Sequence, residues 1–330
     1  MTTHEPLPVT IDDVRAAAQR VGGRVHRTPV LTSRTLGEAT GARVFCKAEN
    51  LQRTGAFKIR GAFNAIASLP AQEKEHGVVA YSSGNHAQAV ALAARELGVP
   101  ATVLMPKDAP RLKREATAGY GARVIEFDRY TESREQLAHE IAERTGASII
   151  PPFDHPAVMA GQGTAALELL EQVPDLDALV VPIGGGGLAS GCAVAARALR
   201  PSIRVIGVEP AAGDDARQSL AAGHIVQIDV PHTVADGAQT TALGQHTFPV
   251  LRRELEQIVT VTDDELLHAC RFLLERMKTL VEPTGALAAA AVLTRAVGVA
   301  GQRVGVILSG GNTELARLAA LHRLKEKNAL

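Results

Sequence analysis

The sequence predicts an α/β protein with parallel sheets. Short apolar runs rich in β-branched residues alternate along the chain with longer Ala- and Leu-rich runs that have helical spacing. Such alternation is typical of folds in which helices cover the faces of a mostly parallel sheet. The strand expected over residues 178–182 is apolar throughout, as in strands buried on both faces. No repeat of 20–50 residues and no low-complexity linker divides the chain.

The expected helices have apolar residues three and four positions apart, and some have acidic residues in the first turn, where the helix dipole favours them. Asp12 and Asp13 open the first helix in this way, and Asp263 opens a late one. We expect helices over residues 11–21, 58–69, 86–97, 112–118, 131–145, 161–171, 189–199, 263–278, 285–297 and 313–325.

The expected strands are short and lie between these helices. They cover residues 42–46, 78–81, 101–105, 123–127, 178–182, 204–208 and 303–308. The elements between residues 77 and 146 form a self-contained alternating set. We therefore predict a small domain over residues 77–146, inserted in a larger domain made of residues 1–76 and 147–330.

The composition is that of an ordinary globular protein, with 46% hydrophobic and 21% charged residues. The net charge is zero and aromatic residues make up 3%, which argues against binding to nucleic acid through a basic surface or a stacking platform. The N-terminal residues lack the features of a signal peptide, and the longest apolar stretch, residues 286–293, is shorter than the ~20 residues that span a bilayer. The three cysteines, Cys46, Cys192 and Cys270, fit a reducing compartment. We expect a cytoplasmic protein.

Four consecutive glycines begin at Gly184, between an apolar strand and a helix. Backbone N–H groups in such a turn, together with the positive end of the helix dipole, can hold a phosphate without Lys or Arg. Glycine allows the backbone to approach the phosphate because it has no Cβ. A flexible strand–helix turn is one alternative. A dinucleotide site is another, because Gly184, Gly186 and Ala189 have a relaxed dinucleotide spacing and Glu209 follows about 20 residues later.

Lys58 lies among small or apolar neighbours, with Ala56 and Phe57 before it and Ile59 after it. Desolvation lowers the pKa of a lysine and makes it a usable amine. Such an amine can form an imine with an aldehyde cofactor and then remove the Cα proton of a substrate. The alternative is a surface lysine at the start of a helix.

Two polar runs follow expected strands. The N–H groups and hydroxyls of residues 82–88 are suited to a substrate carboxylate, and Asn85 can hydrogen-bond the phenolic oxygen of a cofactor. Ser309 lies at the carboxyl end of its strand, where open α/β sheets bind ligands. Its neutral hydroxyl, facing a pyridine nitrogen, favours rapid β-elimination over a long-lived carbanion. Helix capping is the alternative for both runs. The amine, the two anion cradles and the late hydroxyl together indicate pyridoxal phosphate.

A short acidic loop contains Glu209, Asp214 and Asp215. Carboxylates and backbone carbonyls are the ligands that Mg²⁺ and Ca²⁺ prefer. The loop is therefore a candidate cation site, with a solvated acidic loop as the alternative.

The chain resembles the fold-type II pyridoxal-phosphate enzymes, and among them the serine/threonine ammonia-lyases (dehydratases) and serine racemases. The resemblance implies a fold like that of the tryptophan synthase β subunit, with two three-layer α/β/α domains, the small one closing over the substrate. The matching motifs run nearly end to end, in the family's order: Thr28-Pro29, Thr32-Ser33, Lys47-Ala48-Glu49-Asn50, Phe57-Lys58-Ile59-Arg60-Gly61-Ala62, Ser83-Gly84-Asn85-His86, Ala160-Gly161-Gln162-Gly163-Thr164, the four glycines, Asp236-Gly237, Glu282-Pro283-Thr284 and Ser309-Gly310-Gly311-Asn312.

The resemblance also implies roles for single residues. Lys58 would form the Schiff base with the cofactor, and Ser83 would be a second catalytic residue on the opposite face of the ring. The cofactor-binding residues would be Phe57, Lys58, Asn85, Gly184, Gly185, Gly186, Gly187, Leu188 and Ser309. The substrate-binding residues would be Ser82, Ser83, Asn85, His86 and Arg134. The ligands of a cation, Mg²⁺ or alternatively Ca²⁺ or Mn²⁺, would be Glu209, Gly213 through its carbonyl, and Asp215.

The activity implied by the resemblance is β-elimination from threonine or serine, yielding a 2-oxo acid and ammonia, in a homodimer. One alternative is a serine racemase in which Ser83 returns the proton, and another is a 3-hydroxyaspartate dehydratase in which Arg134 meets the extra carboxylate. The acidic residues Glu209 and Asp215 favour the racemase-like branch. Phe153 favours the ammonia-lyases, because mammalian racemases have an amide after the proline. A module that binds a phosphorylated metabolite without turnover is the remaining alternative.

Overall fold

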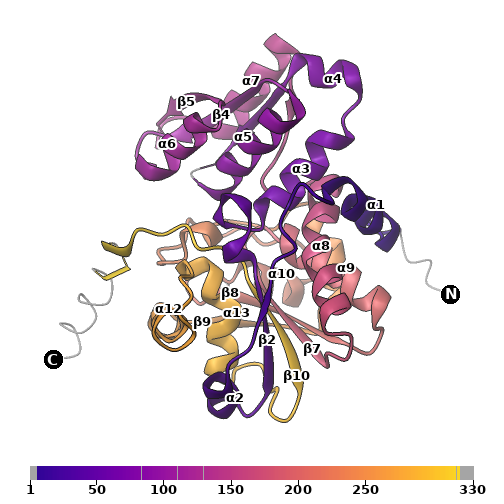
Figure 1. The fold of residues 1–330 in the computed structure, drawn as a ribbon. Helices are drawn as coiled ribbons and strands as arrows, with labels where there is room; N and C mark the ends of the chain where they lie inside the picture. Colours follow the sequence, from indigo (N-terminus) through magenta and orange to yellow (C-terminus); the bar gives the residue numbers. More distant parts are fainter. Residues whose placement is uncertain (1–5, 83, 110, 129, 317, 320–330) are drawn as a thin grey trace.

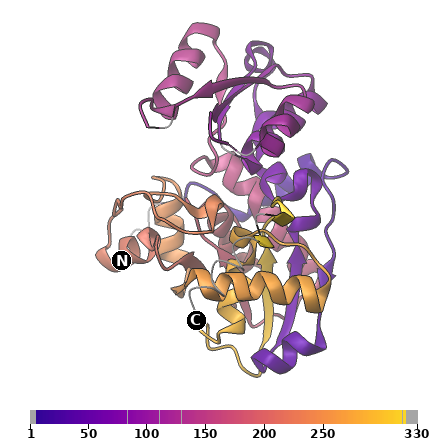
Figure 2. The same ribbon diagram turned by 90° about the vertical axis from the view of Figure 1, so that its left-hand side faces the viewer.

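The computed structural model describes residues 6–82, 84–109, 111–128, 130–316 and 318–319. Two sheets, each covered by helices, form the upper and the lower part of the molecule in both views (Figures 1 and 2). The predicted α/β class with parallel sheets is confirmed. Among the described residues, no helix has the length and apolar character needed to cross a membrane.

The lower part contains the large sheet, which combines strands from both ends of the sequence. All neighbouring strands pair in parallel except β1, which is antiparallel to β2. The order across the sheet is β1 (Val30–Leu31), β2 (Arg43–Ala48), β10 (Arg303–Leu308), β7 (Ala178–Pro182), β8 (Arg204–Pro210) and β9 (Gln257–Val261).

The upper part contains the small sheet, whose neighbouring strands all pair in parallel. Every strand of this sheet lies between Val78 and Ile149, close to the predicted small domain, whose boundaries at residues 77 and 146 stay a prediction. The order is β5 (Arg123–Phe127), β4 (Ala101–Pro106), β3 (Val78–Tyr81) and β6 (Ser148–Ile149).

The helices begin where the sequence supplies caps. Thr10 and Thr262 each form a capping box with an acidic residue three positions later, and Pro156 and Pro283 each occupy a first turn. The helices are α1 (Ile11–Val21), α2 (Arg34–Thr40), α3 (Lys58–Ser68), α4 (Ala71–His76), α5 (Asn85–Leu97), α6 (Arg111–Gly119), α7 (Arg134–Thr145), α8 (Pro156–Gln172), α9 (Gly187–Leu199), α10 (Asp215–Ala222), α11 (Thr247–Glu254), α12 (Asp263–Met277) and α13 (Pro283–Leu293), with short 3₁₀ turns η1 (Glu49–Leu51), η2 (Arg53–Gly55) and η3 (Asp236–Ala238).

The core lies on both faces of the large sheet. Strand β7 is buried throughout, as expected. Its residues Leu179 and Val181 pack with α8 and α9, whereas Ala178 and Val180 face the opposite cluster, which includes α12 and α13. This two-sided burial holds the carboxyl end of β7, from which the glycine run continues.

Several boundaries differ from the sequence predictions. The helix expected from residue 131 begins at Arg134, because Ser133 caps it, and the helix expected from residue 161 begins at Pro156. The sequence patterns did not predict strands β1, β6 and β9, or the helices α2, α4, α10 and α11. The helix expected over residues 313–325 falls largely on residues outside the described part.

A buried group of charges fixes the position of α3. Arg60 is fully buried and contacts the carboxylates of Glu49 (2.7 Å) and Glu168 (2.8 Å). The buried amine of Lys47 lies 2.7 Å from a carboxylate oxygen of Glu168. Opposite charges compensate each other in this interior. The group therefore ties α3 to β2, η1 and α8, two residues after Lys58.

Candidate active site

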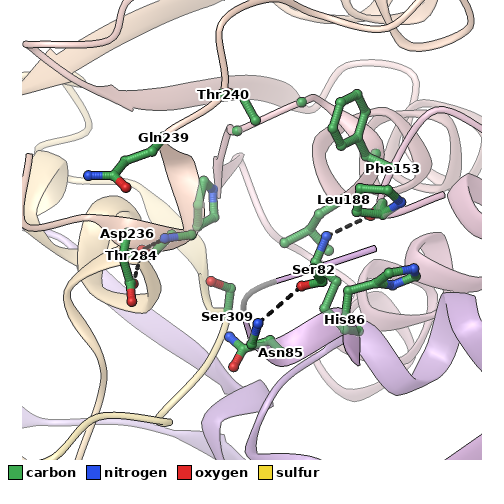
Figure 3. A pocket seen from close by; sticks show the side chains of 18 of the residues that line it. Ser82, Asn85, His86, Phe153, Leu188, Asp236, Gln239, Thr240, Thr284 and Ser309 are labelled. Carbon is green, nitrogen blue, oxygen red and sulfur yellow. Dashed lines mark hydrogen bonds between the residues drawn. The ribbon is translucent and has the colours of Figure 1, made fainter. Parts of the chain in front are cut away.

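A pocket lies between the two sheets, at the carboxyl ends of β3, β7 and β10 (Figure 3). This is the edge at which open parallel sheets bind ligands. It is lined by Phe57, Lys58, Tyr81, Ser82, Gly84, Asn85, His86, Lys113, Arg134, Pro152, Phe153, Pro182, Ile183, Gly184, Gly185, Gly186, Gly187, Leu188, Asp236, Gly237, Gln239, Thr240, Glu282, Thr284 and Ser309. The structure thus brings Lys58 and the glycine run to one place with Arg134, Ser309 and four residues of the polar run, Ser82, Gly84, Asn85 and His86. Ser83 lies outside the described residues.

Lys58 is the first residue of α3, and its side chain points into this pocket. Its Nζ donates to the carbonyl oxygen of Pro152 at 2.6 Å. Desolvation lowers the pKa of Lys58 to about 8, and the negative charge of Glu282 partly opposes this shift. The lowered pKa increases the fraction of this amine that is neutral near neutral pH, which is the form that a nucleophile or a base requires.

The four glycines form a turn that leads into α9, and a Cβ at its last three positions would overlap other atoms. A Cβ on Gly185 would lie 2.4 Å from ring atoms of Phe153, and one on Gly187 would lie 2.9 Å from the backbone of Phe153. Gly186 has a φ of +93°, which a residue with a side chain rarely adopts. The first N–H groups of α9 have no partner within the helix, so this turn fits the predicted anion cradle, which stays a prediction.

Hydrogen bonds of Thr247 and Asp154 support the glycine turn on the side away from the pocket's open space. Thr247 donates from its Oγ1 to the carbonyl of Gly185 (2.8 Å). Asp154 accepts hydrogen bonds from the backbone N–H groups of Gln245 (2.9 Å) and His246 (2.8 Å), next to Thr247. These contacts keep the cradle in its shape. The sequence reasoning missed them, because Thr247 and Asp154 are distant in sequence from the glycines.

Ser82 and Gly84 lie between β3 and α5, and Asn85 and His86 are the first residues of α5. The hydroxyl oxygen of Ser82 accepts from the N–H of Gly84 (3.1 Å). His86 Nε2 donates to the carbonyl oxygen of Ile150 (2.8 Å), and burial lowers the pKa of His86 to about 3, with the charge of Lys58 as a further cause. The imidazole is therefore neutral, with Nε2 bonded to Ile150 and Nδ1 buried without a hydrogen-bond partner among the described residues. A carboxylate at this loop would be bound by backbone N–H groups and hydroxyls rather than by an imidazolium.

Asn85 belongs to a polar chain that links α5 to the lower part of the molecule. Its Nδ2 donates to Oε1 of the buried Glu282 (2.6 Å). Its Oδ1 accepts from Nδ2 of Asn312 (2.9 Å), which also donates to the carbonyl of Thr54 (2.6 Å). One N–H of the Asn85 amide remains for a cofactor. Glu282 and Asn312 stood in matching motifs, but the sequence did not indicate what they contact.

Ser309 directly follows β10 and is 3% exposed. Figure 3 shows its side chain next to that of Asn85, at the same space as Ser82. Its hydroxyl is a neutral group, as the sequence reasoning required for a residue facing a pyridine nitrogen.

Three further polar side chains come from the upper part of the molecule. Arg134 lies at the start of α7, with its guanidinium 5.4 Å from the ring centre of Tyr81 and its Nε donating to Glu135 (2.7 Å). Nζ of Lys113, on α6, lies 3.2 Å from Oδ2 of Asp236, which belongs to the lower part of the molecule. The sequence analysis missed Tyr81, Lys113 and Asp236 as lining residues, because no local pattern indicates contacts between the two parts.

The candidate cation site has two buried carboxylates. Burial raises the pKa of Glu209 to about 8, and the charge of Asp215 adds to this shift. The carboxylate of Glu209 accepts from the backbone N–H groups of Ala216 and Arg217, both at 2.9 Å. Oδ2 of Asp215 is buried without a hydrogen-bond partner among the described residues. These two acidic groups fit a cation, although no cluster of three His, Cys, Asp or Glu side chains occurs in the described part.

The pocket fits pyridoxal phosphate in two respects. The glycine turn lines the pocket while Phe153 and Thr247 leave no place for side chains at Gly185 and Gly186, so backbone atoms are what it offers a phosphate. A desolvated amine with a lowered pKa, that of Lys58, lies in the same pocket.

Comparison with known proteins gives the same assignment. Residues 21–310 match the family described as "Pyridoxal-phosphate dependent enzyme". An L-threo-3-hydroxyaspartate ammonia-lyase of Saccharomyces cerevisiae is 54% identical, over 96% of this chain and 97% of that protein. A serine racemase of Schizosaccharomyces pombe is 52% identical, over 97% of this chain and 98% of that protein.

Solved structures agree with this. A structure of maize serine racemase has a TM-score of 0.91 and 42% identity, covering 98% of this chain and all of that one. A threonine deaminase from T.th. has a TM-score of 0.87 and 47% identity, covering 93% of this chain and 99% of that one. The described pocket therefore lies in a fold shared with racemases and deaminases.

Proposed function

The chain belongs to the family of pyridoxal-phosphate dependent enzymes, and from this premise we propose that it eliminates water from a β-hydroxy amino acid, yielding a 2-oxo acid and ammonia. The observation that carries the proposal is the position of Lys58, a desolvated amine in one pocket with the glycine turn and with Ser82, Asn85 and His86. Relatives acting on 3-hydroxyaspartate and threonine support this class of substrate, which also includes serine. Membership in an enzyme family argues against a binding module without turnover.

Each part of the pocket has a task in this reaction. When bound, pyridoxal phosphate supplies the electron sink that makes the Cα proton acidic. The glycine turn holds a phosphate, and the N–H groups at the start of α5 orient the substrate carboxylate. Lys58, with its lowered pKa, accepts the Cα proton as the general base.

The products follow from the atom balance. Loss of the Cα proton and the β-hydroxyl removes one water and leaves an enamine. Hydrolysis of that enamine after release consumes one water and frees ammonia. The net reaction converts the amino acid to a 2-oxo acid and ammonia without an oxidant.

Substitution of Lys58 tests the proposal directly. Lys58→Ala should abolish both the visible absorbance of the bound cofactor and the production of 2-oxo acid. Lys107→Met, which changes an exposed lysine away from the pocket, is the matched control and should retain both. Full turnover by Lys58→Ala would refute the proposal.

Serine racemisation is the second candidate, supported by the 52% identical racemase of Schizosaccharomyces pombe. The racemase would need Ser83 to return a proton to the other face of Cα. Phe153, which packs against the glycine turn, is the residue that favours the ammonia-lyases. A chiral assay for D-serine, run together with oxo-acid detection, separates the two activities, and Ser83→Ala should lose racemisation first.

Glu209, Asp215 and the carbonyl of Gly213 are proposed ligands of Mg²⁺, or alternatively of Ca²⁺ or Mn²⁺. The buried, partner-less oxygen of Asp215 supports this assignment. A cytoplasmic homodimer remains the expected state, and light scattering together with cell fractionation would test it.

A further inference from the structure

The ion pair between Lys113 and Asp236 joins the two parts of the molecule at the pocket. Lys113 lies on α6, and its Nζ is 3.2 Å from Oδ2 of Asp236, at the start of η3. Only 13% of the Lys113 side chain and 27% of the Asp236 side chain are exposed. Because both residues line the pocket, their charges act on whatever binds there.

The Lys113 side chain passes next to Gly84, just before α5. A Cβ on Gly84 would lie 2.7 Å from Cδ of Lys113 and 3.1 Å from its Nζ. The loop therefore leaves room for this lysine by having a glycine at position 84. Lys113 thus extends alongside the loop that is proposed to bind the substrate carboxylate.

The charges that line the pocket show what Lys113 can do. In the described part, the cations of the lining are Lys58, Lys113 and Arg134, and the carboxylates are Asp236 and Glu282. Lys58 is assigned to proton transfer, and the amide of Asn85 donates to Glu282. A second carboxylate on the substrate would be repelled by Asp236 unless a cation stood between them.

Lys113 is better placed for this task than Arg134. The Arg134 side chain is 47% exposed, and its Nε donates to the neighbouring Glu135. Lys113 is more deeply buried, where charges are less screened by water and salt. An ammonium has three donors, so the contact with Asp236 leaves others for a substrate oxygen.

We propose that Lys113 is the residue that determines specificity for dicarboxylic β-hydroxy amino acids such as 3-hydroxyaspartate. Its ammonium binds the second carboxylate of the substrate, while Asp236 holds the ammonium in place and is itself neutralised by it. This inference rests on the proposed elimination reaction and names its substrate class.

The test compares two substrates in the holoenzyme. The kcat/KM values for L-threo-3-hydroxyaspartate and L-serine are measured by ammonia release, and their ratio is the readout. Lys113→Met should lower this ratio by about 10- to 100-fold, the effect of losing one charge-assisted hydrogen bond. Lys113→Arg should retain most of the preference, and Lys107→Met, an exposed lysine of the same part of the molecule, should leave the ratio unchanged.

A second substitution separates attraction by Lys113 from repulsion by Asp236. In Lys113→Met, the carboxylate of Asp236 remains without this ammonium and repels a dicarboxylate. The double variant Lys113→Met with Asp236→Asn should therefore have a higher ratio of kcat/KM for 3-hydroxyaspartate over serine than Lys113→Met alone. A ratio that is unchanged in Lys113→Met, or that falls only in Arg134→Met, would overturn the inference.

Binding without turnover keeps the inference distinct from the proposed reaction. L-aspartate and L-alanine lack a β-hydroxyl, and their dissociation constants can be measured from the change in cofactor absorbance. Lys113→Met should raise the dissociation constant of L-aspartate, relative to that of L-alanine, by about the same 10- to 100-fold factor. If the native enzyme releases no ammonia, the proposed function fails, but the comparison of dissociation constants still tests Lys113. An equal loss of affinity for L-aspartate and L-alanine in Lys113→Met would contradict the proposed role of Lys113.

Discussion

The backbone N–H of Phe57 donates a 3.1 Å hydrogen bond to the backbone carbonyl of Ser309, which joins the segment before Lys58 to the end of β10. The adjacent pair Ala56 and Gly310 forms an isolated antiparallel bridge. The amine of Lys58 and the hydroxyl of Ser309 are thus set on neighbouring backbone segments. Because main-chain contacts hold this arrangement, a change of either side chain tests chemistry more than folding.

The lowered pKa of Lys58 should be measurable in the cofactor-free protein. Its amine is neutral above a pH of about 8, so labelling by an amine-specific reagent, followed by mass spectrometry, should rise with a midpoint near that pH. Glu282→Gln removes the charge that raises the Lys58 pKa, so the midpoint should move to lower pH. A midpoint near the ordinary lysine value of 10.5 would contradict this account.

The glycine turn should not accept a methyl group at Gly185. Gly185→Ala places Cβ within 2.4 Å of the Phe153 ring. Overpacking of this kind costs about 1–3 kcal/mol, so the cofactor dissociation constant should rise about 10- to 100-fold if the turn shifts. Cofactor titration followed by fluorescence measures this change.

Gly184→Ala is the control for Gly185→Ala, because Gly184 has more space around its Cβ position. A Cβ at Gly184 would lie 3.2 Å from its nearest neighbour, the carbonyl of Gly237, so Gly184→Ala should weaken binding less. Phe153→Leu, combined with Gly185→Ala, should recover part of the affinity. Equal losses in the two single alanine variants would show that Phe153 does not set the limit.

The sequence predicted the site residues that come directly after a strand. In a parallel sheet the carboxyl ends of the strands lie along one edge, so the glycines after β7 and Ser309 after β10 had to be close together. Contacts between Lys113 and Asp236, or between Asn85 and Glu282, join segments more than 100 residues apart. No local periodicity or spacing encodes such pairs.

Other features were hidden by short or unusual local patterns. Helix α11 has eight residues and strand β1 has two, too few for a clear periodicity. Glu209 was expected to be a cation ligand, but its carboxylate also accepts from two backbone N–H groups of α10. That second role depends on a helix that the sequence pattern did not show.

Mg²⁺ should stabilise the protein through Asp215. A ligand that binds only the folded state adds about 2.7 kcal/mol at 100 times its Kd, so Mg²⁺ should raise Tm in a thermal-shift assay. Asp215→Asn should remove most of this rise, because the partner-less Oδ2 is lost as a ligand. Asp214→Asn is the matched control: the carboxylate of Asp214 faces Arg217 and Gln218, so the rise should persist. An identical rise in both variants would place the ion elsewhere.

Arg60 should be far more important for stability than an exposed arginine. Removing one partner of a buried ion pair costs about 3–5 kcal/mol, because the other charge is left uncompensated. Arg60→Ala leaves the fully buried Glu49 without its guanidinium and weakens the anchoring of α3, so the free energy of unfolding should fall by this amount. Arg15→Ala removes an exposed pair with Asp12 and should cost at most about 1 kcal/mol. Urea unfolding of the two variants makes the comparison. Similar losses would mean that the buried charges do not hold α3, and the position of Lys58 would then need another explanation.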